Sequence, residues 1–305
     1  MQKILCLIFA VLMLISLAAC EKAPEQVEKD TTSYVPIAAG FGHTLALKSD
    51  RTVLAMGYDN DGQRSVEDWT DIIAVSGGAY HSVGLKADGT VVAAGASAAG
   101  QCDVTQWTNI TQLSAGYYHT TALTADGKVL VAATDDYHGT KRSENWTDIV
   151  FITSGYYHNV GVKADGTVLA VGYADHGQCD VSEWTDITQV RAGFSHTVGR
   201  KSDGTFVATG NNENGQCNVQ DWGSEIIDFS AGSNNTAGLK ADGTVVVAGI
   251  GEYSQEDVAD WTDIIAIAAG DSHLLGLKSD GTLLAVGDNI YGQCDVFRWE
   301  GLMTK

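Results

Sequence analysis

The sequence predicts an all-β protein, a seven-bladed β-propeller with four antiparallel strands in each blade. The first observation is a spacing of 38 or 39 residues between successive tryptophans, at Trp69, Trp107, Trp146, Trp184, Trp222, Trp261 and Trp299. The second is that the sequence flanking each tryptophan repeats with the same spacing. The third is that glycine and β-branched residues dominate every copy. A period of this length is typical of repeat proteins, in which each unit buries its apolar face against its neighbours.

The first residues precede this array and carry a targeting pattern. Ile4–Ala19 is almost wholly apolar, which is short for a membrane span and suits the core of a secretory signal. It ends in Leu17-Ala18-Ala19-Cys20, which resembles a bacterial lipobox. Residues 1–19 are therefore predicted to be a signal peptide and Cys20 a lipidated (palmitate-bearing) first residue of the mature chain. The alternatives are an ordinary signal peptide and a short membrane anchor.

Residues 20–33 form the predicted tether between this lipid anchor and the propeller. They are rich in Glu, Lys, Thr and Ser, contain Pro24 and show no apolar pattern, so we expect no packed structure here. Two or more acyl chains hold a protein durably on a membrane. The expected location is the bacterial cell envelope, on the extracytoplasmic side.

The charge of the chain excludes one class of partner. The 305 residues carry a formal net charge of −20, and no basic cluster interrupts it. Such a charge opposes binding to nucleic acid and to anionic lipid headgroups, and it favours solubility and a cationic partner. We expect a monomer.

The second copy illustrates how one repeat is divided into strands. Ile72–Ser76 is short and β-branched, and Ser82–Lys86 and Thr90–Ala94 are two β-rich runs joined by Asp-Gly, a strong hairpin signal. Gln101–Val104 is the expected short fourth strand. Four strands repeated seven times are typical of a propeller. The alternative, a β-solenoid, usually has shorter coils, and no 3.6-residue periodicity supports helices.

The limits of the array indicate a closed ring spanning residues 34–305. Tyr34 and Leu302 both fall in the slot that Ile72 occupies in the second copy, so the array starts and stops at one point of the repeat. The two changes in repeat length fall in connections. One lies beside Tyr137-His138-Gly139 and the other at Gly223-Ser224-Glu225, where insertions leave the strands intact.

Two sets of aligned residues suggest chemistry but are better explained as scaffold. Six histidines share one slot, in which Asn235 is the seventh residue. A metal-binding ring requires all seven to converge on the axis, so we expect each imidazole to satisfy backbone groups instead. The tryptophans are predicted to pack between blades rather than to form a carbohydrate platform. The six histidines are His43, His81, His119, His158, His196 and His273.

The repeated aspartates and cysteines have similar structural explanations. An Asp before Gly favours a tight turn, and these loops lack the alternating acidic ligands that calcium requires. Asp50 is followed by Arg51, so we expect strain or another turn type there. The cysteines of the array are expected to be small buried side chains rather than disulfides or metal-binding thiolates. They are Cys102, Cys179, Cys217 and Cys294.

The connections differ between the two ends of the predicted propeller. The loops before each histidine and before each Gln101-type glutamine share one face, and the Asp-Gly turns and Trp-Thr-Asp-Ile links share the other. The first face varies between copies and is aromatic and acidic, which is typical of binding surfaces; neutral drift is the alternative. The predicted ligand-binding face comprises Phe41, Tyr80, Tyr117, Tyr118, Tyr156, Tyr157, Phe194, Asp135, Asp136, Tyr137, Tyr173, Tyr253 and Tyr291.

The repeat resembles a known family. His43-Thr44-Leu45-Ala46-Leu47-Lys48 and Gly287-Asp288-Asn289-Ile290-Tyr291-Gly292-Gln293 are similar to the "G-x-x-H-T-x-x-L … D-G … G-x-N-x-x-G-Q" repeat of the RCC1 family. The resemblance covers Tyr34 to about Leu302 and implies a seven-bladed propeller. The Gly-Gln-Cys-Asp-Val ending departs from the eukaryotic "G-Q-L-G" and resembles bacterial versions. With the lipobox, the chain is therefore similar to bacterial RCC1 domain-containing lipoproteins.

Three function classes follow. The preferred hypothesis is a non-enzymatic, lipid-anchored scaffold that binds a protein, a peptide or a glycan outside the cell. The first alternative is an enzyme, such as a lyase or hydrolase, with a site built from the loops of one face. The second is a guanine-nucleotide exchange factor, which rests on the family resemblance alone and requires a cytosolic GTPase. No nucleophile elbow, phosphate loop or metalloprotease motif is present, so neither catalytic residues nor a cofactor is predicted.

Overall fold

A computed structural model describes residues 36–134, 136–251 and 257–304. All of these belong to the compact unit Thr32–Lys305. The predicted signal peptide, Cys20, the tether and Tyr34 lie outside the described residues. Within the described part of the chain, no helix is long and apolar enough to cross a membrane.

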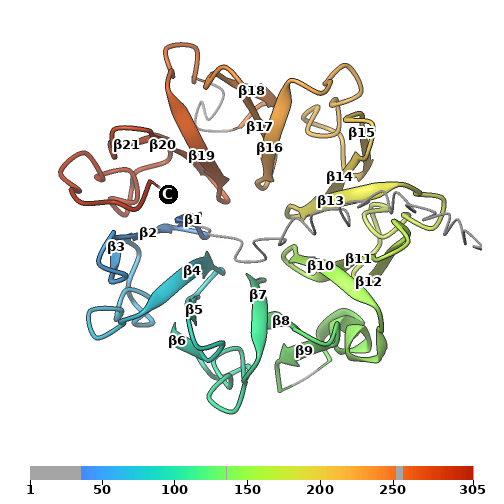
Figure 1. The fold of residues 1–305 in the computed structure, drawn as a ribbon, viewed down its shortest axis with the longest axis horizontal. Helices are drawn as coiled ribbons and strands as arrows, with labels where there is room; N and C mark the ends of the chain where they lie inside the picture. The colour runs from blue at the N-terminus through green and yellow to red at the C-terminus, as the bar shows by residue number, and fades with distance from the viewer. Residues whose placement is uncertain (1–35, 135, 252–256, 305) are drawn as a thin grey trace, which may run out of the picture. The chain divides into compact units, whose positions relative to one another are not determined.

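The strands form seven separate antiparallel sheets arranged around a central axis (Figure 1). Each sheet contains three consecutive strands, with the first nearest the axis. In chain order the strands are β1 (Ile37–Ala39), β2 (His43–Leu47), β3 (Val53–Gly57); β4 (Ile72–Gly77), β5 (His81–Lys86), β6 (Val91–Gly95); β7 (Ile110–Ala115), β8 (Thr120–Thr124), β9 (Val129–Ala132); β10 (Ile149–Ser154), β11 (His158–Lys163), β12 (Val168–Gly172); β13 (Ile187–Ala192), β14 (His196–Lys201), β15 (Phe206–Gly210); β16 (Ile226–Ala231), β17 (Thr236–Lys240), β18 (Val245–Ala248); β19 (Ile264–Ala269), β20 (His273–Lys278), β21 (Leu283–Gly287).

The predicted seven-bladed propeller is confirmed, and in the described residues the sheet of each blade has three strands, without the expected fourth. The expected fourth strand, Gln101–Val104, forms turns. Its backbone N–H groups are bonded locally: Asp103 N donates to Gly100 O at 3.0 Å and Val104 N to Cys102 O at 2.8 Å. A segment whose donors are satisfied by its own carbonyls has none left for a sheet ladder.

The Asp-Gly hairpins form as the sequence predicts. In the second blade, Asp88 Oδ1 accepts hydrogen bonds from Thr90 N at 2.9 Å and from Thr90 Oγ1 at 2.6 Å. Gly89 between them has a φ of +78°, which glycine adopts without steric cost. The Asp-Gly-Thr motif therefore forms a turn, as expected, and the aspartate carboxylate is bonded to the threonine that leads into the next strand.

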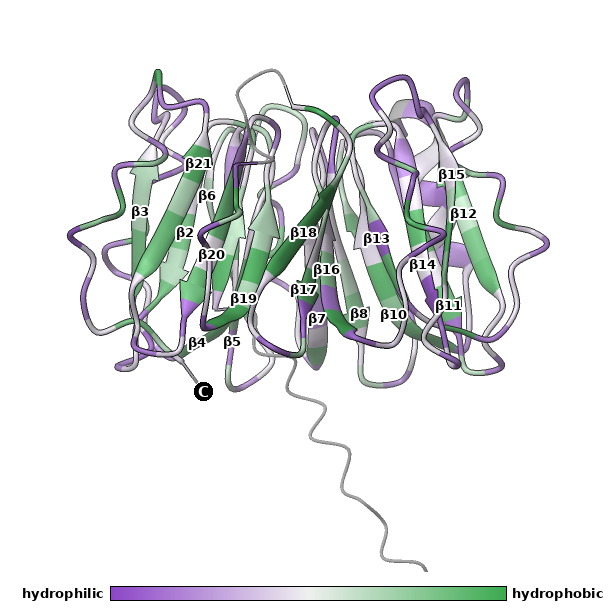
Figure 2. Cartoon of the chain, turned by 90° about the horizontal axis from the view of Figure 1, so that it is seen from above, coloured by the Kyte–Doolittle hydropathy of each residue, from purple (hydrophilic) through white to green (hydrophobic). Residues whose placement is uncertain are grey.

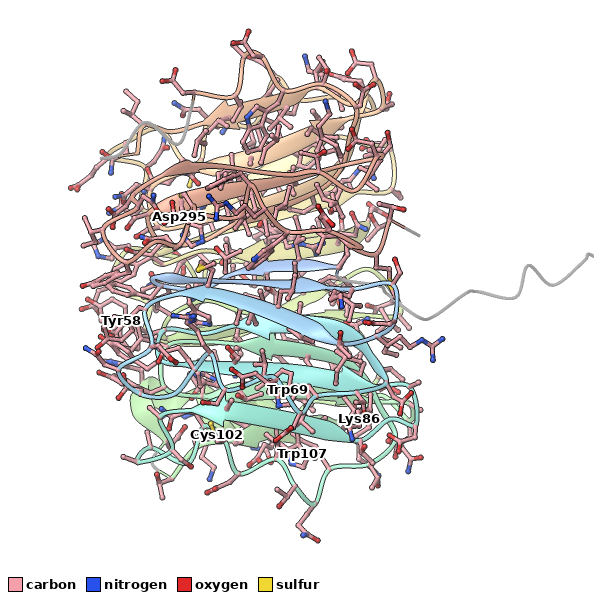
Figure 3. The ribbon with its side chains drawn as sticks, turned by 90° about the vertical axis from the view of Figure 1, so that its left-hand side faces the viewer. Tyr58, Trp69, Lys86, Cys102, Trp107 and Asp295 are labelled. Carbon is pink, nitrogen blue, oxygen red and sulfur yellow. The ribbon has the colours of Figure 1, made fainter. Side chains whose placement is uncertain are left out.

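The tryptophans pack between neighbouring blades, which confirms their predicted core role. Trp146 follows the third blade and packs with Leu123 of that blade and Ile152 of the fourth. Its ring faces Gly161, where an added Cβ would lie 2.8 Å from Cζ3 of the tryptophan. Trp69 and Trp107 hold the corresponding positions in adjacent repeats (Figure 3). The hydrophobic residues lie in the strands, while the loops at both ends are more hydrophilic (Figure 2).

Each buried histidine bonds a side chain of the next blade rather than a backbone group, which corrects our expectation. His81 Nε2 lies 2.8 Å from Thr120 Oγ1, and that hydroxyl donates to Gln101 O at 2.8 Å. Because the hydroxyl proton is used by the carbonyl, Nε2 must carry its own proton and donate. The reason for the difference is geometric. The imidazole extends across the interface between blades, where it meets a hydroxyl group, and that hydroxyl group in turn bonds the backbone carbonyl.

This inter-blade link is missing at one position of the ring. Asn235 replaces histidine in the sixth blade, and Leu274 replaces the hydroxyl residue in the seventh. Both side-chain polar atoms of Asn235 are buried without a hydrogen-bond partner. The two departures therefore occur together, at one interface.

The two ends of the array meet in the first blade, as the shared slot predicts. Leu302 pairs with Lys48, just as Ile72 pairs with Lys86 in the second blade. Met303 N donates to Leu47 O at 2.8 Å. Residues from the C-terminus thus extend the inner strand of the first blade, and β1 contacts β19 and β20 of the seventh.

The remaining sequence features lie where expected. The first insertion forms a short 3₁₀ segment, η1 (Tyr137–Asn145), outside the sheets. The four cysteines of the array are free thiols and are buried or half-buried. Cys102 Sγ donates to Ala96 O at 3.1 Å, and burial raises the pKa of this thiol to about 11. The thiols therefore act as small, protonated packing groups.

Candidate binding face

The connections divide between the two ends of the propeller as the sequence predicts. A loop that precedes a histidine contacts a loop that precedes a glutamine, because Tyr58 N donates to Gly42 O at 2.7 Å. At the other end, Ile110 N in a Trp-Thr-Asn-Ile link donates to Gly89 O in an Asp-Gly turn at 3.0 Å. Tyr58 and Lys86 mark these two ends in Figure 3.

Aromatic side chains from neighbouring blades form one continuous cluster at the first end. Tyr117 is at its centre, with ring centroids 5.4 Å from Tyr80, 5.0 Å from Tyr156 and 5.1 Å from Tyr157. The hydroxyl groups of Tyr80 and Tyr117 are hydrogen-bonded at 3.0 Å. We call this group the aromatic cluster, and it consists of Phe41, Tyr58, Tyr80, Tyr117, Tyr118, His138, Tyr156, Tyr157, Tyr173, His176, Phe194 and Tyr291.

Nine of the predicted face residues belong to this cluster. They are Phe41, Tyr80, Tyr117, Tyr118, Tyr156, Tyr157, Phe194, Tyr173 and Tyr291. Asp136 is exposed and accepts a hydrogen bond from Lys141 N at 2.7 Å. Asp135 and Tyr253 lie outside the described residues, as does the side chain of Tyr137.

Three members of the cluster were not in the predicted set. Tyr58 joins it through Tyr291, at a centroid distance of 4.9 Å, and His138 joins through Tyr173 at 5.1 Å. His176 contacts Tyr173 at 6.2 Å. Tyr58 occupies the same slot of the repeat as Tyr173, directly after the third strand, so the register carried a signal that identifies it.

The aromatic cluster is concentrated on part of the ring. At least one of the two positions before each slot histidine carries a ring in the first five blades, for example Phe41, Tyr117 and Phe194. The sixth and seventh blades instead carry Ser233-Asn234 and Asp271-Ser272 at these positions. Most of the rings are half-buried, and Phe194 and Tyr291 are exposed to 37% and 44%. The face therefore combines a broad, partly accessible aromatic area with a smaller polar area.

One hydrogen bond joins these two areas across the axis. Tyr156 of the fourth blade donates from its hydroxyl to Asp271 Oδ1 of the seventh blade at 2.7 Å. Ser272 Oγ donates to the other carboxylate oxygen at 2.7 Å. Burial, followed by the nearby Asp271 carboxylate, holds the pKa of Tyr156 far above its usual value. The phenol thus remains protonated and acts as a hydrogen-bond donor.

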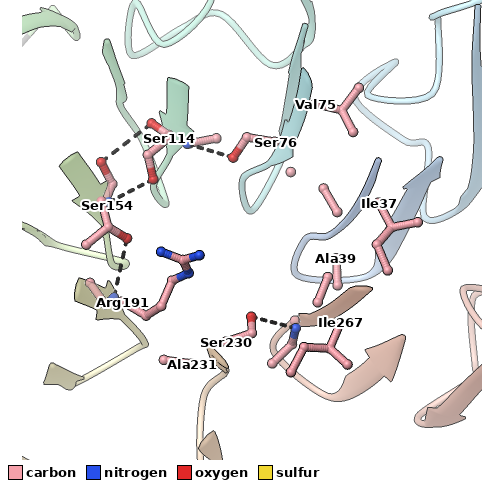
Figure 4. Close-up of a pocket in the computed structure, with 18 of the residues that line it drawn as sticks. Ile37, Ala39, Val75, Ser76, Ser114, Ser154, Arg191, Ser230, Ala231 and Ile267 are labelled. Atoms are coloured by element: carbon pink, nitrogen blue, oxygen red, sulfur yellow. Dashed lines mark hydrogen bonds between the residues drawn. The ribbon is translucent and has the colours of Figure 1, made fainter. Parts of the chain in front are cut away.

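A central cavity of about 550 Å³ runs beneath this contact, lined by the inner strands of the blades. Its lining includes Ser76, Ser114, Ser154 and Ser230, and Ser114 Oγ accepts a hydrogen bond from Ser154 N at 2.8 Å (Figure 4). Arg191 extends into it and pairs with Asp228 at 3.2 Å. Its guanidinium also lies over the rings of Phe151 and Phe229. Neither Arg191 nor these serines were among the residues predicted from the sequence.

The fold and the repeated links define a seven-bladed β-propeller, and comparison with known proteins identifies its family. A model of the regulator of chromosome condensation (RCC1) repeat matches more than half of the chain, over residues 36–63, 72–101, 110–132, 149–178, 187–216 and 264–293. The chain belongs to the RCC1 repeat family. The sixth blade, which lacks the slot histidine, is outside these matches. A search of curated proteins found no significant sequence relative.

Solved structures share this fold at low sequence identity. The ectodomain of the receptor kinase CR4 of Physcomitrella patens superposes with a TM-score of 0.68 at 19% identity, covering 83% of this chain and 72% of that one. The CRINKLY WD40 ectodomain of ACR4 from Arabidopsis thaliana gives 0.65 at 18%, covering 83% and 96%. Prp20p from Saccharomyces cerevisiae, whose binding to Gsp1p and histones is described with its structure, gives 0.62 at 16%, covering 77% and 80%.

Proposed function

We propose that this protein is a lipid-anchored scaffold of the bacterial cell envelope that binds a polypeptide partner through its aromatic cluster. The observation that carries the proposal is the cluster itself, in which rings from six blades meet on one face. Partly exposed tyrosines with polar neighbours are enriched in protein-binding surfaces because they offer large contact areas at low entropic cost.

The repetition of the fold also favours binding over catalysis. The polar residues buried in the core belong to links that recur from blade to blade, such as His81 with Thr120 and His158 with Thr197. A catalytic site requires residues that act together at one place. Among structural neighbours, Prp20p is described as binding other proteins, which fits a scaffold role.

The position of Pro36 bears on which end of the propeller is free to bind a partner. Pro36 O accepts a hydrogen bond from Leu47 N at 2.7 Å, near the end of β2 that leads into the Asp50 turn. Pro36 therefore lies at the end of the propeller opposite the aromatic cluster, so a lipid anchor that precedes Pro36 in the chain is compatible with a free aromatic cluster.

The lipid anchor is tested by metabolic labelling with a clickable palmitate analogue. We expect the wild-type chain to incorporate the label and Cys20→Ser to lose it. Label that persists in Cys20→Ser would contradict the anchor.

The binding face is tested by comparing three baits produced from Glu21 onward. These are the wild type, a variant with Tyr117, Tyr156 and Tyr157 changed to Ser, and a matched variant with Lys86, Lys163 and Lys240 changed to Ser at the opposite end. We expect the wild type and the lysine variant to retain the same partners from envelope extracts and the tyrosine variant to lose them. The melting temperature of each bait is measured in parallel.

Two results would contradict the proposed face. One is equal capture by all three baits. The other is a tyrosine variant that melts as early as Trp146→Ala, which creates a core cavity costing about 3–5 kcal/mol. In that case the tyrosines are part of the core.

A further inference from the structure

Asp271 is a half-buried carboxylate at the axial end of the aromatic cluster. Its backbone N donates to Gly40 O at 3.2 Å, which places it beside Phe41. Its oxygens accept hydrogen bonds from the hydroxyls of Tyr156 and Ser272. The ring centroid of Tyr156 in turn lies 4.6 Å from that of Phe194 and 5.0 Å from that of Tyr117. One negative charge thus lies beside Phe41 and is bonded to Tyr156, at the edge of the aromatic cluster and on the wall of the central cavity.

Among the described residues, Asp271 has no cationic partner. The ion pairs in this part of the chain are Lys48–Asp50, Lys128–Asp126, Arg191–Asp228 and Lys278–Asp263. Only neutral hydroxyl groups compensate the Asp271 charge. A half-buried carboxylate has lost part of its hydration, so a cation that reached it would be bound more strongly than at an open surface.

The distribution of charge over the propeller also favours a cationic ligand at this end. Lysines gather at the Asp-Gly turns, at the opposite end, where Lys48, Lys86, Lys128, Lys163, Lys201, Lys240 and Lys278 lie. Near the aromatic cluster, the Arg64 and Lys141 side chains donate to the backbone carbonyls of Gly57 and Ala133. With a net charge of −20, the protein attracts cations over long range.

Aromatic faces and a carboxylate together have a specific chemical preference. The negative faces of tyrosine and phenylalanine rings attract ammonium and guanidinium groups, and this attraction grows when water is excluded. A carboxylate adds a charge-assisted hydrogen bond. An anionic ligand would be repelled by Asp271, and a neutral sugar would gain nothing from its charge.

We propose that Asp271, Tyr156, Tyr117, Phe194 and Phe41 form a subsite for a Lys or Arg side chain of a basic polypeptide segment. This inference rests on the proposed binding function and adds the chemistry of the partner. In the free protein the Tyr156 hydroxyl occupies Asp271 Oδ1 at 2.7 Å. The incoming cation takes over that oxygen while the ring of Tyr156 remains as part of the aromatic wall.

This competition gives two substitutions opposite effects. Asp271→Asn keeps a hydrogen-bonding group of the same size but removes the charge, so affinity for a cationic peptide falls by about tenfold. Tyr156→Phe keeps the ring and frees the carboxylate oxygen from its donor, so affinity rises about two- to fivefold. If the site instead used the tyrosine hydroxyl for binding, Tyr156→Phe would lower the affinity.

The experiment is a fluorescence-anisotropy titration of fluorescein-labelled tetralysine with the chain from Glu21 onward. The variants are Asp271→Asn, Tyr156→Phe and the matched control Asp280→Asn. Asp280 is an exposed turn carboxylate at the opposite end that accepts a hydrogen bond from Thr282 N at 2.8 Å. The control changes the net charge by the same amount, so we expect it to retain wild-type affinity. Tetra-(ε-acetyl-lysine) is the neutral probe and should not bind.

Three outcomes would overturn the subsite. Equal weakening by Asp271→Asn and Asp280→Asn would indicate general electrostatic attraction only. Weakening by Tyr156→Phe would mean that its hydroxyl contributes to binding. No binding of tetralysine by the wild type would refute the cationic ligand, and if the tyrosine variant still lost its partners in the capture experiment, the broader binding function would stand.

Discussion

Arg51 adopts the backbone conformation that glycine occupies in the other six Asp-Gly turns. Its φ is +65°, against +78° for Gly89 and +87° for Gly204. In this left-handed region a side chain crowds the backbone and costs roughly 1–2 kcal/mol, which glycine avoids. The Asp50 carboxylate still accepts hydrogen bonds from Thr52 N at 3.1 Å and Thr52 Oγ1 at 2.6 Å, so the turn keeps its geometry. The strain expected from the sequence is therefore present at one residue.

Replacing Arg51 by glycine should stabilise the protein. The relief of left-handed strain exceeds the extra chain entropy of glycine, so we expect the free energy of unfolding to rise by about 0.5–1 kcal/mol. Chemical denaturation with urea measures this change. Gly89→Arg, which imposes the same strain in the next blade, is the control and should destabilise. An unchanged or lower stability of Arg51→Gly would show that the turn is not strained.

At the scale of the element, a histidine side chain links each pair of neighbouring blades except the sixth and the seventh. Elsewhere a slot histidine contacts the next blade, as in His196 with Thr236 Oγ1 at 2.9 Å. Asn235 has no such partner because Leu274 occupies the hydroxyl position and is fully buried in the core. At this interface packing of the two side chains replaces the histidine link, while Ala269 N still donates to Ser230 Oγ at 2.9 Å.

Asn235→His and Leu274→Thr should be favourably coupled. Each single change destabilises the protein, because the histidine gains no partner and the threonine leaves a cavity. Together they rebuild the link, so we expect a coupling free energy of about 1–2 kcal/mol from a double-mutant cycle on urea denaturation. The reverse cycle, His196→Asn with Thr236→Leu, serves as the matched control. Strict additivity of the two changes would disprove the equivalence of the interfaces.

At the scale of the whole molecule, the six buried histidines make the ring sensitive to pH. Burial lowers the pKa of His43 to about 4 and that of His81 to about 3, from an ordinary value of 6.5. Below pH 6.5 the unfolded chain binds protons that the folded state excludes, so stability is complete above this pH and falls as the pH drops toward 4. The turn aspartates have lowered pKa values, that of Asp50 being about 2, so their contribution is lost at lower pH.

Lowering the pH from 7.5 to 5.0 should therefore lower the melting temperature steeply. Each buried histidine contributes a loss of up to about 2 kcal/mol at pH 5. Differential scanning calorimetry at 0.5-unit intervals tests this, with His158→Gln as a comparison whose pH dependence should be shallower. A melting temperature that stays constant between pH 7.5 and 5.0 would be incompatible with neutral, buried imidazoles.

The candidate face could be predicted only in part. Slots in the repeat indicated that Tyr117, Tyr156 and Tyr157 lie in loops at one end, because a meander alternates its connections between two ends. Their mutual contacts depend on how close seven loops come at the axis, which spacing along the chain does not specify. The Tyr156–Asp271 hydrogen bond joins residues 115 positions apart in sequence. Nothing local to either residue indicates the other.

The sequence by itself determined the number of blades, the closing slot and the turn chemistry. The 38-residue period fixes the repeat because every copy must bury the same apolar face, and Leu302 meets Lys48 because it fills the slot of Ile72. Only the tertiary structure decided that Gln101–Val104 forms turns and that each histidine bonds the following blade. It also decided which rings meet on the aromatic face. These features depend on contacts between repeat copies in space, whereas the sequence period reflects only the requirements common to every copy.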